Sequence, residues 1–361
     1  MDPENLALFN SNSCLDPDNY NQMLLGANCE TSSTKETLHL RNRSKCHSLL
    51  QEKKSYIPSL IEHPNGIKAS IIDEDKEVTR KSSSHTLTYH EAPHYLKHNP
   101  YILSGYRCHG LSALKCLESM FWMTNETINI WSHVLGWMLF CGLTFYDLLL
   151  LNFHASPVDK FIVGLLLGCF QICMLTSSFY HIFSCRSEKH FNCFLTYDLL
   201  GIALSLLAIY MSGIYYAFWC HRGIQKFYLT TVFILFLFSL TLQIPSLKVS
   251  SNMKMLTFVA WAAYGVVPTV HWTFVMGGWE NPIVSMLLPR VITMYAICAA
   301  AFAIYITRFP ECLFKGKVDL FGSSHQWWHI FIVIALYYWH NTGIKYIEYR
   351  MHHGCATDLR L

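Results

Sequence analysis

The sequence predicts an all-α fold: a bundle of seven transmembrane helices preceded by a disordered cytosolic tail. The first observation is composition, since 52% of the 361 residues are hydrophobic and only 14% are charged, whereas soluble domains carry about 25% charged residues. The second is that the charge is concentrated in the N-terminal quarter. The third is a series of apolar segments, each near the ~20 residues that cross a hydrocarbon core. The net charge of +3 and the lack of a basic stripe interleaved with aromatics argue against a nucleic-acid partner.

Residues 1–90 are polar, rich in Ser, Lys, Glu and Asn, and have no sustained apolar period. Such a segment cannot bury enough apolar surface to offset its chain entropy, which predicts a disordered cytosolic tail. The first residues also lack a basic stretch followed by an apolar core. We therefore expect no cleavable signal peptide and expect the first membrane helix to act as the targeting signal.

Residues 91–126 are expected to form a juxtamembrane segment. Pro and Gly punctuate an extended stretch over residues 96–107. Residues 111–122 then place Leu114, Leu117 and further apolar side chains near one another at helical spacing, which predicts a short interfacial helix. A soluble amphipathic turn is the alternative, and the membrane helix that follows at once disfavours it.

A transmembrane core is expected over residues 127–346, with a short C-terminal tail over residues 347–361. Connectors that hold Gly, Pro or charge separate the apolar segments, and no strand pattern competes with the helices. Pro268 lies inside the fifth segment, where its ring clashes with the preceding turn, so a kink is expected. The expected spans are 127–151, 161–185, 194–218, 227–247, 254–276, 286–307 and 325–346.

The positive residues beside the spans weakly favour a cytosolic N-terminus. In that orientation nine Lys and Arg residues would lie on the cytosolic side and seven on the other side, and short cytosolic loops favour Lys and Arg. The long polar tail favours the same orientation.

The 14 Cys residues are scattered, many of them in apolar runs. In such runs Cys acts as a small buried hydrophobe. Because no C-x-x-C pair and no regular spacing occurs, the sequence does not indicate a disulfide framework.

Three motifs bring polar residues to one side of the membrane. His325 and His329 are four residues apart, so they share one helix face at the start of the seventh span. His181 closes the second span one turn after Ser177, and Asp198 opens the third. Because each helix crosses the membrane once, these three helix ends lie on the same side. Ionisable groups within a membrane indicate a functional site.

Three imidazoles that leave one coordination position open are the ligand set of a catalytic zinc. In such a site Asp198 would orient the bound water and accept its proton, and Ser177 would hydrogen-bond the water or a substrate carbonyl. Two alternatives stay open. The histidines could satisfy one another through hydrogen bonds between helices, or a zinc ion could hold three helices together without catalysis.

Other histidines in the apolar segments have simpler interpretations. We expect His133 to be a contact between packed helices, with a role beside the metal as the alternative. His271 and His340 lie deeper or nearer the opposite face, so we expect them to be hydrogen-bonded core residues and not ligands.

Several motifs, in order and with fitting separations, resemble those of the progestin and adipoQ receptor family. The resemblance runs from about residue 90 to the C-terminus. It implies a seven-helix fold with a cytosolic N-terminus, zinc bound by His181, His325 and His329, and Asp198 as the water-orienting carboxylate. The motifs are NPYILSGYR at 99–107, NETINIWSH at 125–133, Ser177-x-x-x-His181, Asp198 after a short basic loop, and SHQWWH at 324–329.

Within this family, AYGVVPTVHW at 263–272, PRVITMY at 289–295 and FGSSHQWWH at 321–329 look most like the Golgi-resident member that sequesters Raf kinase. That likeness implies a Golgi membrane protein that tethers a Raf-type kinase on its cytosolic side and damps the MAP kinase cascade, with the plasma membrane as the alternative location. If tethering is the function, Leu114 and Leu117 are the expected partner-binding residues.

The adiponectin receptors of the same family hydrolyse the amide of ceramide at their zinc site. This implies an alternative function, a zinc-dependent membrane amidohydrolase that acts on ceramide-like lipids. The catalytic residues would then be Asp198 and Ser177, and the partner would be a membrane lipid.

Overall fold

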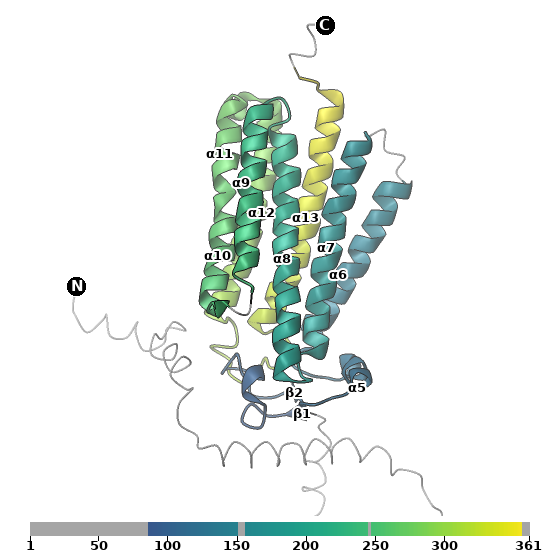
Figure 1. Ribbon diagram of the computed structural model, residues 1–361, viewed down its shortest axis with the longest axis vertical. Coiled ribbons are helices and arrows are strands. Elements are labelled where there is room, and N and C mark those ends of the chain that lie inside the picture. Colours follow the sequence, from purple (N-terminus) through teal and green to yellow (C-terminus); the bar gives the residue numbers. More distant parts are fainter. Residues whose placement is uncertain (1–85, 151–155, 245–246, 356–361) are drawn as a thin grey trace, which may run out of the picture.

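The computed structural model describes residues 86–150, 156–244 and 247–355, which form a bundle of long helices with a small cap at one end (Figure 1). The all-α prediction is confirmed for this part of the chain. The expected tail, up to residue 85, lies outside the described residues. The helices of the bundle are α6 (Thr127–Phe145), α7 (Pro157–Phe183), α8 (Glu188–Ala217), α9 (Arg222–Thr241), α10 (Ser251–Tyr264), α11 (Val266–Val275), α12 (Pro282–Thr307) and α13 (Ser324–His352), and a π-helical turn, Tyr146–Leu150, extends α6.

Six helical segments of the described chain are long and apolar enough to cross a membrane, and they correspond to the first six expected spans. The expected seventh span, 325–346, is helix α13. This helix has 29 residues but is more polar than the others, because it carries His, Asn, Gln, Trp and Tyr side chains. It nevertheless packs against α6, α7, α8 and α12. Because α13 ends at His352, the first residues of the expected tail, 347–361, are helical.

Polar caps set the starts of several helices a few residues before the apolar segments begin. Ser156 and Asp159 form a capping box at the start of α7, where Pro157 takes the first helical position. Ser187 accepts a hydrogen bond from the backbone N–H of His190 and caps α8 in the same way. A cap satisfies N–H groups that the helix itself leaves unpaired. The apolar pattern alone therefore missed these first turns.

The fifth span is broken into α10 and α11 at Gly265, close to the kink expected from Pro268. A proline lacks the N–H that would bond the carbonyl four residues earlier, which here belongs to Tyr264. Gly265 also permits a close approach of neighbouring helices, because a Cβ atom there would lie 2.7 Å from the Tyr210 hydroxyl oxygen. That hydroxyl donates a hydrogen bond to the Trp261 carbonyl at 2.5 Å.

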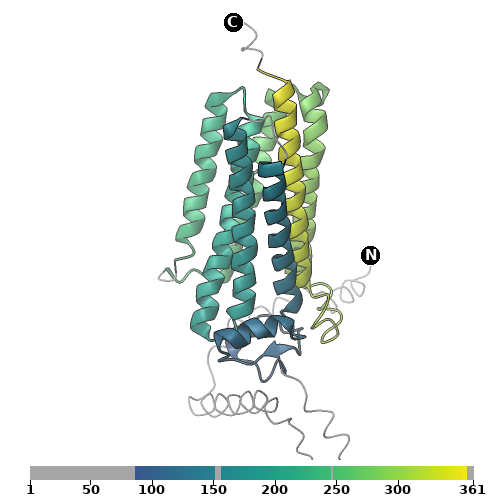
Figure 2. The ribbon, with the colours of Figure 1, turned by 90° about the vertical axis from the view of Figure 1, so that its right-hand side faces the viewer.

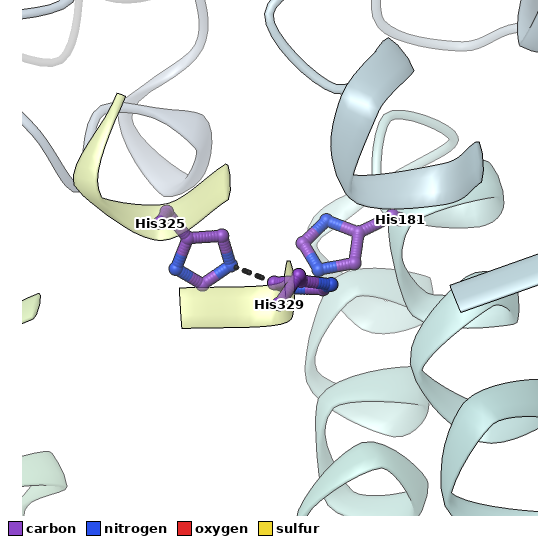
Figure 3. Close-up of side chains that lie close together, drawn as sticks. All are labelled: His181, His325 and His329. Atoms are coloured by element: carbon purple, nitrogen blue, oxygen red, sulfur yellow. Dashed lines mark hydrogen bonds between the residues drawn. The ribbon is translucent and has the colours of Figure 1, made fainter. Parts of the chain in front are cut away.

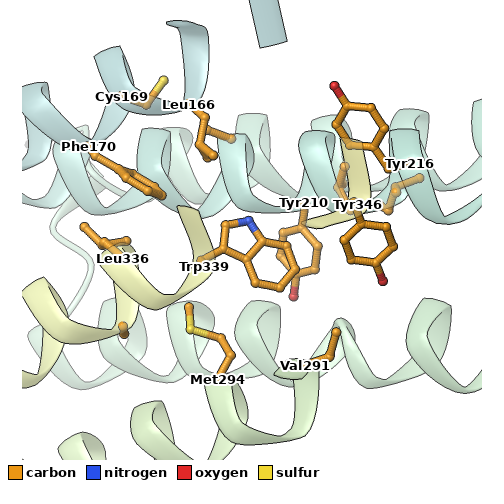
Figure 4. Close-up of a cluster of buried hydrophobic side chains, with 14 of the residues drawn as sticks. Leu166, Cys169, Phe170, Tyr210, Tyr216, Val291, Met294, Leu336, Trp339 and Tyr346 are labelled. Atoms are coloured by element: carbon orange, nitrogen blue, oxygen red, sulfur yellow. The ribbon is translucent and has the colours of Figure 1, made fainter. Parts of the chain in front are cut away.

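Helix α13 lies at the centre of the apolar core (Figure 4). Leu336, Trp339 and Tyr346 of this helix belong to a buried cluster that draws side chains from α7, α8 and α12 as well. Trp339 also donates its indole N–H to the Ser212 hydroxyl at 3.3 Å. An indole in an apolar core needs such a partner, since an unpaired buried donor is costly. This packing fixes the direction of α13, whose first two turns contain His325 and His329.

Residues 86–122 form what we call the juxtamembrane cap, which lies across one end of α6 and α7 (Figure 2). It contains β1 (Thr86–Leu87), a 3₁₀ turn, β2 (Tyr106–Arg107) and α5 (Ala113–Glu118), and a second 3₁₀ turn follows α5. The expected short helix is thus present. The cap has its own apolar core, which also includes Ile130 of α6 and Ile182 of α7. The cap is therefore packed onto the bundle.

Two features differ from the sequence-based expectations. A short antiparallel ladder pairs Thr86 with Arg107 and Leu87 with Tyr106, although no strand was expected; a ladder of two residues has no sequence period to detect. A disulfide joins Cys220, between α8 and α9, to Cys355, after α13. The two residues are 135 positions apart in sequence, so only the folded bundle brings them together.

Candidate metal centre

Three histidines point toward one another at the capped end of the bundle (Figure 3). His181 lies in the last turn of α7, and His325 and His329 lie in the first two turns of α13. One ring nitrogen from each lies within 4.8 Å of the other two. The Nε2 atoms of His325 and His329 are 3.2 Å apart. The structure therefore brings together the three residues that the sequence proposes as ligands.

The donor set suits a zinc ion, and one of its nitrogen separations matches a zinc site. Zinc binds imidazole nitrogen at about 2.0–2.1 Å, so two ligands of a tetrahedral site lie about 3.3–3.4 Å apart. The His325–His329 separation is close to that value. His181 Nε2 is buried and has no hydrogen-bond partner among the described residues. Since buried polar atoms are almost always paired, a metal ion would satisfy this nitrogen.

Glu126, the residue just before α6, orients His181. Its Oε2 atom lies 2.7 Å from His181 Nδ1, and the same oxygen accepts a hydrogen bond from the Asn129 amide at 2.7 Å. Burial raises the pKa of Glu126, but the adjacent His181 outweighs burial and holds the pKa below its ordinary range. A carboxylate on Nδ1 leaves the Nε2 lone pair free for a metal, as in carboxylate–histidine–zinc arrangements.

Glu126 lies in the NETINIWSH motif, but the sequence indicates no role for it at the site. A signal was present, because it is an acidic residue that directly precedes a membrane-spanning helix. What the sequence lacked was the distance from Glu126 to His181, which is 55 residues away along the chain.

Asp198 and Ser177 lie beside the histidines. Ser177 is buried in α7, one turn before His181, and Asp198 is half-buried in α8. Asp198 is near enough to interact with both Ser177 and His181. It is not part of the close ligand group. The carboxylate thus lies beside the three nitrogens without being one of the close ligand group.

Two further histidines contact the ligand group. The His133 ring lies against the His329 ring, with centroids 3.9 Å apart and the planes tilted by 33°. The contact that His133 makes between helices is therefore a contact with a candidate ligand. His98 of the cap, which the sequence gave no reason to select, lies 6.4 Å from the His325 ring centroid. Burial lowers the pKa of His98, which favours its neutral imidazole.

The remaining histidines named from sequence are hydrogen-bonded away from the ligand group. His271 Nδ1 lies 2.8 Å from the Tyr228 hydroxyl. His340 Nε2 lies 2.5 Å from a carboxylate oxygen of Asp147, and both side chains are buried. Both histidines therefore have polar partners, as expected from the sequence; His340 is buried and His271 is partly buried.

The proposed partner-binding residues lie outside the metal centre. Leu114 and Leu117 on α5 are 79% and 42% exposed. Phe121, which follows α5, is also exposed and packs against the Trp131 ring of α6. These apolar side chains therefore lie on the surface of the described residues.

Comparison with known proteins gives the class of this protein. Residues 121–340 match the family model described as haemolysin-III related, which covers more than half of the chain and includes all three histidines. Progestin and adipoQ receptor family member 3 from Mus musculus is 43% identical over 274 residues, which is 74% of this chain and 88% of the mouse protein. The human protein of the same name is 42% identical with the same coverage. An adiponectin receptor protein from Drosophila melanogaster is 30% identical over 75% of this chain and 62% of the fly protein.

The chain therefore belongs to the progestin and adipoQ receptor family. It is a multi-pass membrane protein of that family, with the six long apolar helices described above.

Proposed function

We propose that this chain is a Golgi membrane protein with an intramembrane zinc centre, which tethers a Raf-type kinase through its cytosolic side and negatively regulates the MAP kinase cascade. α13 is the seventh span in this proposal, the N-terminus is cytosolic, and the cap faces the cytosol. The single observation that supports the zinc centre is the convergence of three histidine nitrogens within 4.8 Å of one another. The kinase, the Golgi membrane and the orientation follow from the motif resemblance and the charge distribution.

The residues of the centre have distinct roles in this proposal. His181, His325 and His329 bind the metal, and a bound zinc ion supplies Lewis acidity toward a fourth ligand. Glu126 holds His181 in the tautomer that binds through Nε2. His133 packs against His329 and restricts its ring.

The apolar stripe on α5 is the proposed docking surface for the kinase. The Leu114 side chain is 79% exposed. Exposed apolar patches mark interaction sites. A helix also presents its side chains in a fixed geometry, so binding to it costs less ordering entropy than binding to a disordered tail.

Recruitment of the kinase to the Golgi in cells tests this surface. Leu114→Glu with Leu117→Glu should abolish recruitment, because a charge cannot enter an apolar interface without a partner. Deletion of residues 1–85 should spare it, and so should His325→Ala. The matched control is Leu313→Glu, because Leu313 is an exposed apolar residue of the loop before α13. Recruitment that survives the double substitution in a correctly localised protein would contradict the docking role.

A second function, hydrolysis of ceramide-like lipid amides, is favoured by one observation, the position of Asp198 near Ser177 and His181. Asp198 would accept a proton from the attacking water, and Ser177 would hydrogen-bond the substrate carbonyl; a zinc ion held by the three histidines would supply Lewis acidity. Asp198→Asn should then retain the metal and lose hydrolysis by about 10²–10⁴-fold, the usual contribution of general-base catalysis. The assay is ceramide turnover by purified protein. Equal turnover in the wild type and the variant would favour a structural metal.

A further inference from the structure

The juxtamembrane cap contacts both helix ends that carry the candidate ligands. On one side, the backbone N–H of Gly110 donates to the carbonyls of Cys185 and Arg186, just after α7. On the other side, the backbone N–H of Gly316, in the loop between α12 and α13, donates to the Tyr101 carbonyl at 3.0 Å. His181 lies in the turn of α7 just before Cys185, and His325 and His329 lie in α13, which follows the loop that holds Gly316. The cap is therefore placed to control the separation of the ligands.

Arg107 connects the cap to the helix end that carries His181. Its guanidinium is buried and donates to the backbone carbonyls of His181 and Ile182, the latter at 2.9 Å. The same group donates to the Ser119 hydroxyl at the end of α5, also at 2.9 Å. The last carbonyls of a helix have no partner within the helix, and a cation there is favourable. One side chain thus joins β2, the end of α5 and the ligand-bearing turn of α7.

Glu311 connects the cap to the start of α13, as Arg107 connects it to the end of α7. Its carboxylate is completely buried. It accepts the backbone N–H of Ser324 at 2.7 Å and the hydroxyl of the same residue, and it accepts the side-chain amide of Asn99, in the cap, at 3.1 Å. An anion at a helix N-terminus is favourable because the first N–H groups are unpaired. Ser324 directly precedes His325, so Glu311 fixes the turn from which that ligand projects.

We propose that Arg107 and Glu311 are positioning residues of the metal centre, which hold the ligand-bearing ends of α7 and α13 at the separation that zinc requires. The inference rests on the proposed zinc site. Neither residue is a ligand: Arg107 acts through the backbone of His181, and Glu311 acts through the backbone of Ser324.

The physical basis is that apolar packing fixes the position of each helix less precisely than a metal site requires for its ligand distances. The apolar core fixes the middle of each helix, but helix ends fray and have unpaired polar groups. A zinc site tolerates errors of only about 0.2 Å in its ligand distances. All three ligands lie within the last or first two turns of their helices. The charged side chains that hydrogen-bond to those helix ends therefore decide whether the three histidine nitrogens converge.

Zinc affinity of the purified full-length protein, measured by competition with a chelator, tests this proposal. Arg107→Lys keeps the charge and loses the fork that reaches two carbonyls, and Glu311→Gln keeps the size and loses the charge. Each should weaken zinc binding by about 10–100-fold, as substitutions behind metal ligands do. The matched controls, Lys115→Met and Glu348→Gln, remove exposed charges that form only short-range surface ion pairs, and they should bind zinc like the wild type.

A second measurement separates positioning from stability. The visible absorption of bound Co²⁺ reports tetrahedral geometry, and it should change in both variants. The melting temperature of the metal-free protein gives the purely structural effect. If Arg107→Lys does not fold, Glu311→Gln tests the same proposal from the other side of the centre.

The outcomes distinguish the positioning role of Arg107 and Glu311 from the existence of the zinc centre. Variants that lose stability but keep wild-type zinc affinity and an unchanged Co²⁺ spectrum would overturn the positioning role and leave the zinc centre standing. A folded wild-type protein that binds no zinc would overturn both.

Discussion

Glu126 offers a graded test of how the metal centre is built. Its Oε2 atom lies 2.7 Å from His181 Nδ1 and 2.7 Å from the Asn129 amide nitrogen. Glu126→Gln preserves the shape and one carbonyl oxygen that can still accept from His181, but it removes the negative charge. Glu126→Ala removes the acceptor and leaves His181 Nδ1 unpaired in a buried site. The loss of affinity should therefore be larger for Ala than for Gln.

The magnitude follows from what carboxylates behind metal ligands contribute. Their loss typically costs 10–100-fold in metal affinity, which corresponds to about 1.4–2.8 kcal/mol. We expect Glu126→Gln near the lower value and Glu126→Ala near the upper value. Chelator competition gives both dissociation constants, and Glu348→Gln on the exposed face of α13 is the control. Zinc affinity that is the same in Glu126→Ala and the wild type would refute the orienting role of the carboxylate.

Three further predictions follow from the geometry. His325→Ala removes one of three ligands and should leave the folded protein with almost no bound zinc by elemental analysis; full occupancy would rule out the three-histidine site. Gly105→Ala should lower the stability by about 1–3 kcal/mol in thermal unfolding, because Gly105 has a φ of +84° and a Cβ atom there would lie 2.9 Å from the backbone nitrogen of Asn125. Cys220→Ser should lower the stability by about 2–4 kcal/mol, the usual effect of losing a disulfide; Cys355→Ser and the double substitution should give the same value, and an additive double variant would contradict the pairing.

Part of the candidate metal site could be predicted from the sequence. The spacing of His325 and His329 fixes their common face, and the alternation of helices brings His181 and Asp198 to the same end of the bundle. Both inferences depend only on helix periodicity and on a single crossing per helix. Glu126 and His98 were not found in this way, because their contacts with the histidines depend on how the cap and α6 pack and not on any period.

The membrane class, the first six spans and the end of the bundle where the histidines gather can all be predicted from the sequence. These follow from apolar length and helical period, which are local properties of the chain. Three features could not be predicted from the sequence: the disulfide between Cys220 and Cys355, the attachment of Arg107 and Glu311 to the ligand-bearing helix ends, and the central place of the polar helix α13. Those features join residues far apart in sequence. The disulfide, the hydrogen bonds of the buried polar groups and the packing around α13 all require the folded bundle to bring their partners together.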